Sequence, residues 1–210
     1  MANHLRQVSF LFILWAGLAP SQVPSGPFSH ALHLKLKADC TSCHTTVAAS
    51  ERVEDNLLPS PSACKPCHES VVISEPMPVA IAKFSHKQHA PFGSIGPVLQ
   101  AAVKSKAYLG TPNHTEELDT KNACVSCHRA VVTSAAPSHE LIPQMSDCLT
   151  CHNKIELPYS CETCHSTKQN LKPVNHIDGF VDQHTTAKVD KAGCNTCHGN
   201  SFTCMGCHKG

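Results

Sequence analysis

Fourteen cysteines are spread along this sequence of 210 residues, and each belongs to a pair with two residues between its members. A histidine directly follows the second cysteine of every pair, so the pentapeptide CxxCH occurs seven times. The cysteine pairs are Cys40/Cys43, Cys64/Cys67, Cys124/Cys127, Cys148/Cys151, Cys161/Cys164, Cys194/Cys197 and Cys204/Cys207. The histidines that follow them are His44, His68, His128, His152, His165, His198 and His208. Any fold of this chain has to accommodate seven copies of one motif.

Several kinds of chemistry use cysteines at this spacing. An even number of cysteines in a secreted chain suggests disulfides, and CxxC alone also fits a zinc site or a thioredoxin-like redox pair. None of these requires a histidine after every second cysteine. In c-type haem attachment, the two thiols form thioethers with the haem vinyl groups and the adjacent imidazole becomes the proximal iron ligand. The sequence therefore predicts seven haem c groups, with zinc or disulfides as the remaining alternatives.

Eight further histidines lie outside the motifs and beyond the first 21 residues. They are His30, His33, His86, His89, His114, His139, His176 and His184. Eight imidazoles for seven irons predict bis-histidine ligation with one histidine to spare. His30, His114 and His184 stand ten residues before the first cysteine of a motif, and His139 stands nine before one. This recurrence suggests an upstream loop that delivers the second axial ligand, although the pairing of histidines with haems stays open.

The N-terminal 21 residues have the features of a secretory signal peptide. Arg6 lies in a short polar segment, and the apolar run 8–19 that follows it is too short to span a bilayer. A small-residue site at Ala19-Pro20-Ser21 predicts cleavage before Gln22. We therefore expect a periplasmic protein that does not span the membrane after cleavage, with a retained N-terminal anchor as the alternative.

The rest of the chain has few residues for a conventional hydrophobic core. Five Phe and no Trp follow the predicted signal, while the sequence contains 15 Pro, 10 Gly and 16 His. We expect haem macrocycles to fill the interior of a mostly irregular fold with short α-helices and little or no β-sheet. Without haem, the chain should be unfolded.

The motifs divide the mature chain into three predicted units. These are a dihaem unit at 22–76, a trihaem unit at 77–171 and a dihaem unit at 172–210. The central unit contains a long insertion without motifs, in which a helix is predicted to start near Pro97 and to end before Gly110. Val98, Leu99, Ala102 and Val103 share one face of this helix, which we interpret as a packing face against haem.

The charge balance argues against a nucleic-acid partner. The chain has 17 Lys and Arg side chains against 16 Asp and Glu, and haem propionates would make the loaded protein acidic. An acidic protein repels the phosphate backbone.

The segment FSHALH at 28–33, followed by the motifs at Cys40 and Cys64, resembles the class III cytochromes c. These are small, low-potential trihaem and tetrahaem periplasmic carriers. The resemblance implies that His30 ligates the haem of Cys40 and that His33 reaches a different haem. It also implies similar parts for His86 and His89, which lie in FSHKQH. The seven motifs, the long insertion and the C-terminal half depart from this family and are more similar to larger multihaem cytochromes.

Bis-histidine iron has no vacant position for a substrate, which favours an electron carrier over an enzyme. The expected donor is a quinol-oxidising membrane complex or a dehydrogenase, and the expected acceptor is a reductase or an extracellular acceptor. Two alternatives remain: a multihaem reductase of nitrogen or sulfur oxyanions, and a haem subunit of a larger complex or filament.

Overall fold

The computed structural model describes residues 27–73, 75–152, 161–173, 176, 178–180 and 191–198. In this part of the chain, short helices are joined by turns and irregular segments, and there is no strand. The α-helices are α1 (His30–Lys35), α2 (Cys40–Cys43), α3 (His86–His89), α4 (Gly96–Lys104), α5 (Ala123–Cys127), α6 (Met145–Cys151) and α8 (Lys191–His198). The 3-10 helices are η1 (Val47–Ala49), η2 (Pro61–Ala63), η3 (Ala90–Phe92), η4 (Thr115–Asp119), η5 (Arg129–Val132), η6 (His139–Leu141) and η7 (Cys161–Thr163). The expectation of short helices with little or no sheet is confirmed for the described residues.

Some of the predicted features lie outside the described residues. They are the signal peptide, the candidate ligand His184 and the whole of the last motif, with Cys204, Cys207 and His208. The seventh haem site therefore stays a prediction from the sequence. None of the described helices is both long enough and apolar enough to cross a membrane.

Side-chain caps start three of the helices that carry cysteine motifs, α2, α5 and α6. The carboxylate of Asp39 accepts a hydrogen bond from a backbone N–H in the first turn of α2. The Asn122 side chain accepts two such bonds at the start of α5. At the start of α6, Gln144 and Asp147 form a capping box. Because a cap satisfies backbone donors that a short helix leaves unpaired, it fixes where each motif turn begins.

The two FSHxxH segments form the capped helices α1 and α3. Ser29 Oγ accepts from Leu32 N at 3.2 Å, and Ser85 Oγ accepts from Gln88 N at 3.3 Å. In each case two motifs follow, and their first cysteines are 24 residues apart: 40 and 64, then 124 and 148. We call residues 28–68 the N-terminal repeat and residues 84–152 the central repeat.

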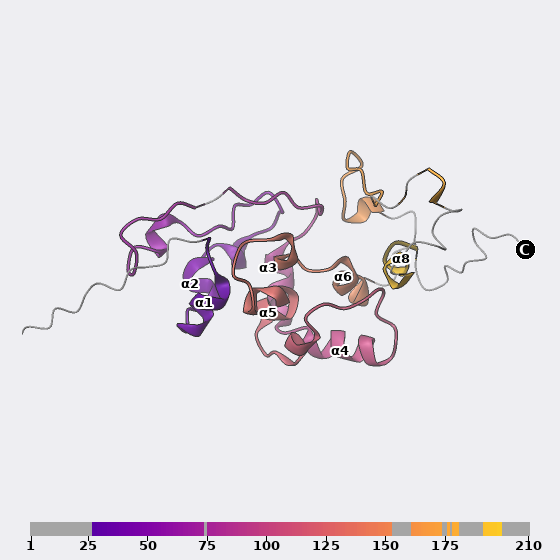
Figure 1. The fold of residues 1–210 in the computed structure, drawn as a ribbon, viewed down its shortest axis with the longest axis horizontal. Helices are drawn as coiled ribbons and strands as arrows, with labels where there is room; N and C mark the ends of the chain where they lie inside the picture. Colours follow the sequence, from indigo (N-terminus) through magenta and orange to yellow (C-terminus); the bar gives the residue numbers. More distant parts are fainter. Residues whose placement is uncertain are drawn as a thin grey trace, which may run out of the picture.

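The repeats lie against each other in the elongated arrangement of Figure 1, with α1 and α2 toward one end and α8 toward the other. Ala31 N in α1 donates to Ser134 O of the central repeat at 3.0 Å. Lys87 N in α3 donates to Ser50 O of the N-terminal repeat at 2.9 Å. Each FSHxxH helix therefore contacts the other repeat.

A small hydrophobic core lies inside the insertion of the central repeat. It consists of Leu99, Tyr108 and Leu118, against which Ile95, Ala102 and Val103 pack. Helix α4 confirms the predicted helix, with Pro97 in its first turn. The structure differs from the expectation at Val98, whose side chain is 48% exposed, because the buried face is centred on Leu99. The buried face packs on η4 and α6.

A buried ion pair joins the two motif segments of the central repeat. Arg129, next to His128, places Nη2 3.0 Å and 3.2 Å from the carboxylate oxygens of Asp147, which precedes Cys148. Their side chains are 2% and 3% exposed. The Tyr108 hydroxyl donates to Asp147 Oδ1 at 2.9 Å. The charges are therefore paired and further hydrogen-bonded, which a buried ion pair requires.

Candidate haem-attachment sites

Five motifs share one backbone turn. In each, the N–H of the motif histidine donates to the carbonyl of the first cysteine, four residues earlier. The distances are 2.8 Å for His44 to Cys40, 2.9 Å for His68 to Cys64, 2.8 Å for His128 to Cys124, 2.9 Å for His152 to Cys148 and 2.9 Å for His165 to Cys161. This turn sets the position of the imidazole relative to the two thiols. All twelve described cysteines are free of disulfides, so their thiols are available for thioether formation; Cys204 and Cys207 lie beyond the described residues.

Five motif histidines lie opposite a histidine from outside the motifs. The distances between ring centres fall in a narrow range, from 6.2 to 6.4 Å. The pairs are His30 with His44 (6.4 Å), His33 with His68 (6.2 Å), His86 with His128 (6.4 Å), His89 with His152 (6.2 Å) and His176 with His198 (6.3 Å).

This separation fits one metal ion between two imidazoles. A metal–imidazole bond is about 2.0 Å long and its nitrogen lies about 1.1 Å from the ring centre, so two rings on opposite sides of one metal have centres about 6.2 Å apart. Direct stacks in this protein are closer, at 4.5 to 5.0 Å. Ordinary packing also reaches such a distance once, edge-on between His89 and Phe92 at 6.1 Å, but each of the five longer histidine pairs joins a motif histidine to a histidine from outside the motifs. The histidine pairs therefore fit the two axial positions of a haem iron.

Backbone carbonyls hold several of these rings by their Nδ1 atoms. Nδ1 of His44 lies 2.7 Å from Leu57 O, and Nδ1 of His128 lies 2.7 Å from Leu141 O. The FSHxxH helices do the same internally: His33 Nδ1 lies 2.8 Å from Ser29 O, and His89 Nδ1 lies 2.8 Å from Ser85 O. A ring that donates its Nδ1–H to a carbonyl keeps Nε2 deprotonated and available for a metal.

Phenylalanines fix the orientation of the paired histidines. In each FSHxxH helix, the phenylalanine stacks on the second histidine and meets the first edge-on, at 4.8 Å in both repeats. The interplanar angles of the stacks are 23° and 28° in the two helices. The stacks are Phe28 on His33 (4.5 Å), Phe84 on His89 (4.5 Å) and Phe180 on His176 (5.0 Å).

Burial keeps three of the paired imidazoles neutral. Burial, reinforced by His44, lowers the pKa of His30. Burial, reinforced by His128, lowers the pKa of His86. Burial also lowers the pKa of His128, partly opposed by the hydrogen bond to the Leu141 carbonyl. A neutral imidazole keeps the lone pair that coordination requires.

Several motif thiols are buried as well. Burial, with a smaller contribution from Asp147, raises the pKa of Cys148 to about 11. Burial raises the pKa of Cys124 and of Cys127. These thiols are protonated at neutral pH, and a thioether would replace them with an uncharged sulfur that suits the same surroundings.

The fifth motif is anchored to the segment that precedes the central repeat. His165 Nδ1 lies 2.8 Å from Ala80 O, and the N–H groups of Ala82 and Lys83 donate to Cys164 O at 2.8 Å and 3.1 Å. Among the described residues, no histidine ring lies opposite His165.

The ten-residue spacing does not bring His114 to its nearest motif. The ring opposite His128 is that of His86, from 42 residues earlier in the sequence. His114 has a left-handed backbone, with φ 44° and ψ 50°, and its Nδ1 lies 3.4 Å from Glu116 Oε1. The spacing did not reveal this pairing, because α3 comes before the insertion in the sequence and the motif at Cys124 comes after it. Only the fold brings the two together.

His139 is likewise separate from the pairs. Its residue is exposed, at the start of η6, and the ring opposite His152 is that of His89. His184 lies outside the described residues. His114, His139 and His184 are thus the three candidates left for the motif at Cys161 and for the motif of Cys204 and Cys207.

Two further observations bear on a bound group. His30 Nδ1 is buried and has no hydrogen-bond partner among the described residues, so this ring nitrogen has an unfilled position where another group could bind. No group of three or more His, Cys, Asp and Glu side chains in the described part of the chain is arranged to hold a metal ion. That arrangement is needed for a metal held by side chains alone, whereas haem iron takes only axial ligands from the protein.

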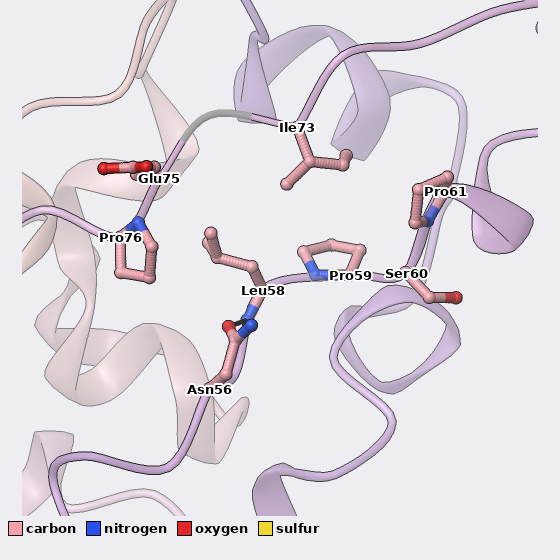
Figure 2. A pocket seen from close by; sticks show the side chains of 8 residues that line it. All are labelled: Asn56, Leu58, Pro59, Ser60, Pro61, Ile73, Glu75 and Pro76. Atoms are coloured by element: carbon pink, nitrogen blue, oxygen red, sulfur yellow. Dashed lines mark hydrogen bonds between the residues drawn. The ribbon is translucent and has the colours of Figure 1, made fainter.

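A hollow of the described surface lies elsewhere. Its volume is about 410 Å³, and Figure 2 shows Leu58 and Ile73 pointing toward it, with Pro59, Pro61 and Pro76 around it. No cysteine or histidine lines this hollow.

Sequence reasoning missed the carbonyl acceptors. Leu57 and Leu141 each lie 13 residues after the motif histidine whose Nδ1 they accept, and Ser50 and Ser134 each lie six residues after the same histidines. These offsets are the same in both repeats, and this regularity is the sequence signal that could have revealed the carbonyl acceptors. No family model, curated protein or solved structure matches this chain.

Proposed function

We propose that this chain is a periplasmic electron-transfer protein with seven covalently attached c-type haems, most of them ligated by two histidines. The five histidine pairs at 6.2 to 6.4 Å carry the proposal. Each pair combines the histidine of a CxxCH turn with a second histidine whose ring is oriented by packing. Electron transfer requires ligands that stay in place in both redox states, and these rings are fixed by carbonyls and phenylalanines.

The pairs give an assignment of axial ligands to five haems. The haem of Cys40 takes His44 and His30, that of Cys64 takes His68 and His33, that of Cys124 takes His128 and His86, that of Cys148 takes His152 and His89, and that of Cys194 takes His198 and His176. This assignment agrees with what the class III resemblance implies for His30 and His33.

When bound, haem iron supplies a one-electron couple, and two imidazole ligands keep its potential low. The protein then has the role of holding the irons close together and away from substrates. Its partners in the proposal are redox proteins: a quinol-oxidising membrane complex or a dehydrogenase as donor, and a reductase or an extracellular acceptor.

The mass and spectrum of the secreted protein, produced in a host that matures c-type cytochromes, test the proposal. We expect a chain starting at Gln22 with seven haem masses added, a low-spin ferric spectrum, and no carbon monoxide binding to the reduced native protein. The variants Cys64→Ala/Cys67→Ala and Cys204→Ala/Cys207→Ala should each lose one haem mass. A product without a Soret band, or with zinc in its place, contradicts the proposal.

The alternative function, a multihaem reductase, needs an iron with an open axial position. One observation makes it worth testing at a defined place, since no described histidine ring lies opposite His165. A high-spin ferric signal that disappears in Cys161→Ala/Cys164→Ala would favour the reductase. Size-exclusion chromatography separates a free carrier from a subunit of a complex or filament.

A further inference from the structure

The FSHxxH helix of each repeat docks on the other repeat. In the N-terminal repeat, Ser29 Oγ and Ala31 N both contact Ser134 O, at 3.0 Å each. In the central repeat, Ser85 Oγ and Lys87 N both contact Ser50 O, at 3.3 Å and 2.9 Å. The acceptor serines hold equivalent positions, six residues after His44 and six after His128. The contact is therefore reciprocal, as between two copies related by a local twofold arrangement.

The reciprocal contact brings together the first motif of each repeat. The Cys124 thiol lies close to the Cys40 thiol, which adds to the effect of burial in raising the pKa of Cys124. None of the four hydrogen bonds of the reciprocal contact involves the second motif of either repeat, at Cys64 or at Cys148.

We propose that the reciprocal docking makes the sites at Cys40 and Cys124 the junction between the repeats, so that the first four sites lie in the spatial order Cys64, Cys40, Cys124, Cys148. The inference rests on the proposed function, which supplies the haems. It differs from the order of the motifs in the sequence, in which Cys64 and Cys124 would be neighbours.

Contacts on the far side of the central repeat extend the same order. The carbonyl of Cys164 accepts hydrogen bonds from the segment that precedes FSHKQH, and the Cys148 thiol has Cys164 as a neighbour. Thr196, inside the sixth motif, lies 3.3 Å from Ser146 at the start of α6. The sites at Cys161 and Cys194 thus follow that at Cys148.

A redox double-mutant cycle tests the junction. His30→Met and His86→Met each replace one distal ligand, which raises the potential of one haem and gives it the spectrum of a methionine ligand. Reducing one of two neighbouring haems disfavours reduction of the other by Coulomb repulsion, which falls with distance. In the double variant, we expect the midpoint potentials of the two methionine-ligated haems to lie further apart than the midpoint potentials of the single variants predict.

The matched control is His33→Met/His86→Met, which modifies the sites at Cys64 and Cys124. Its midpoints should be those of the two single variants. A larger interaction in this control than in His30→Met/His86→Met would overturn the proposed order. Loss of haem from the unmodified protein would instead refute the proposed function, so the two failures are distinguishable.

Engineered disulfides in the haem-loaded protein provide a second measurement, which remains decisive if a methionine does not bind iron. Residues joined by a backbone hydrogen bond have α-carbons within about the 4.4–6.8 Å that a disulfide spans. We expect Ala31→Cys/Ser134→Cys and Ser50→Cys/Lys87→Cys to cross-link. The exchanged pairs, Ala31→Cys/Ser50→Cys and Lys87→Cys/Ser134→Cys, should stay reduced. Cross-linking of the exchanged pairs alone would show that each helix docks on its own repeat and would refute the junction.

Discussion

The N-terminal and central repeats hold their histidines in the same way. Each has a serine-capped FSHxxH helix, a phenylalanine stacked on the second histidine, and a carbonyl 13 residues after the first motif that accepts from its histidine. The four histidine pairs of the two repeats have ring-centre distances of 6.2 and 6.4 Å.

The interiors of the repeats differ. The central repeat contains all seven buried hydrophobic residues of the described chain and the Arg129–Asp147 ion pair. In the N-terminal repeat, Ser50 is the only buried residue among those described, and Leu32 and Leu36 are exposed. Ligand geometry can therefore be set by caps, turns and ring contacts without a side-chain core. The interior of the N-terminal repeat is left to the haems that it is proposed to bind.

The largest expected effect of this difference is on the haem-free chain. The sequence alone predicts that it is unfolded, and the structure sharpens this prediction. In hydrogen exchange of haem-free protein, amides of the N-terminal repeat should exchange like an unfolded peptide, because nothing buried holds them. Any protection should be confined to the core around Leu99. Equal protection in both repeats would show that the N-terminal repeat does not depend on haem.

Thiol alkylation of the same haem-free protein gives an independent readout. Because the thiolate is the reactive form, a Cys148 whose pKa is about 11 should react slowly at about pH 8 and faster as the pH approaches 11. Cys67, which is exposed, is the control. Equal alkylation rates for Cys148 and Cys67 would show that the central repeat is also unfolded without haem.

The next effect concerns the buried charges of the haem-loaded protein. Arg129→Met leaves Asp147 buried without its partner, which should lower the free energy of unfolding by about 3–5 kcal/mol. The double variant Arg129→Met/Asp147→Leu should recover much of this loss, because no unpaired charge remains. Denaturant unfolding measures both.

An ion pair of the N-terminal repeat provides the control for Arg129→Met. Arg52 and Asp55 are 3.8 Å apart and the Arg52 side chain is 75% exposed, so Arg52→Met should leave the unfolding midpoint unchanged. A comparable loss in both variants would mean that the repeats do not differ in the way that their burial indicates.

Substituting one leucine in each repeat compares how tightly the two repeats are packed. Leu99 is 1% exposed and Leu36 is 72% exposed. Leu99→Ala should lower the free energy of unfolding by about 2–5 kcal/mol, because it leaves a cavity in the small core. Leu36→Ala should have little effect in the same denaturant titration. A large effect at Leu36 would indicate that bound haem covers this side chain, and would sharpen the view of the N-terminal interior.

The sequence predicted local features well. The CxxCH motif forms a single helical turn, and the FSHxxH segment contains the serine that caps its own helix. Pro97 marks the start of α4. These features depend on residues only a few positions apart, for which propensity and capping are sufficient.

Pairing was not predictable from spacing. The ten-residue spacing pointed to His114 for the motif at Cys124 and left the pairing open, whereas the structure places the ring of His86, in α3, opposite His128. The docking of each FSHxxH helix on the other repeat was equally out of reach, because it depends on hydrogen bonds such as Ala31 to Ser134, more than 100 residues apart. The equal spacing of 24 residues between the first cysteines of the two motifs that follow each FSHxxH segment is the sequence signal that could have revealed two equivalent bodies.

The smallest predicted effect tests the equivalence of the two repeats directly. Ser29 and Ser85 each cap a helix and donate to the other repeat, at 3.0 Å to Ser134 O and 3.3 Å to Ser50 O. Ser29→Ala and Ser85→Ala should each cost about 1 kcal/mol of stability, since each loses one cap. Because both serines lie at one junction between the repeats, the double variant should also lose less than the sum if the first substitution already loosens that contact. Unfolding of the four proteins measures this coupling. Strict additivity would mean that each serine acts only within its own helix, and that the reciprocal contact is held by the backbone hydrogen bonds from Ala31 and Lys87.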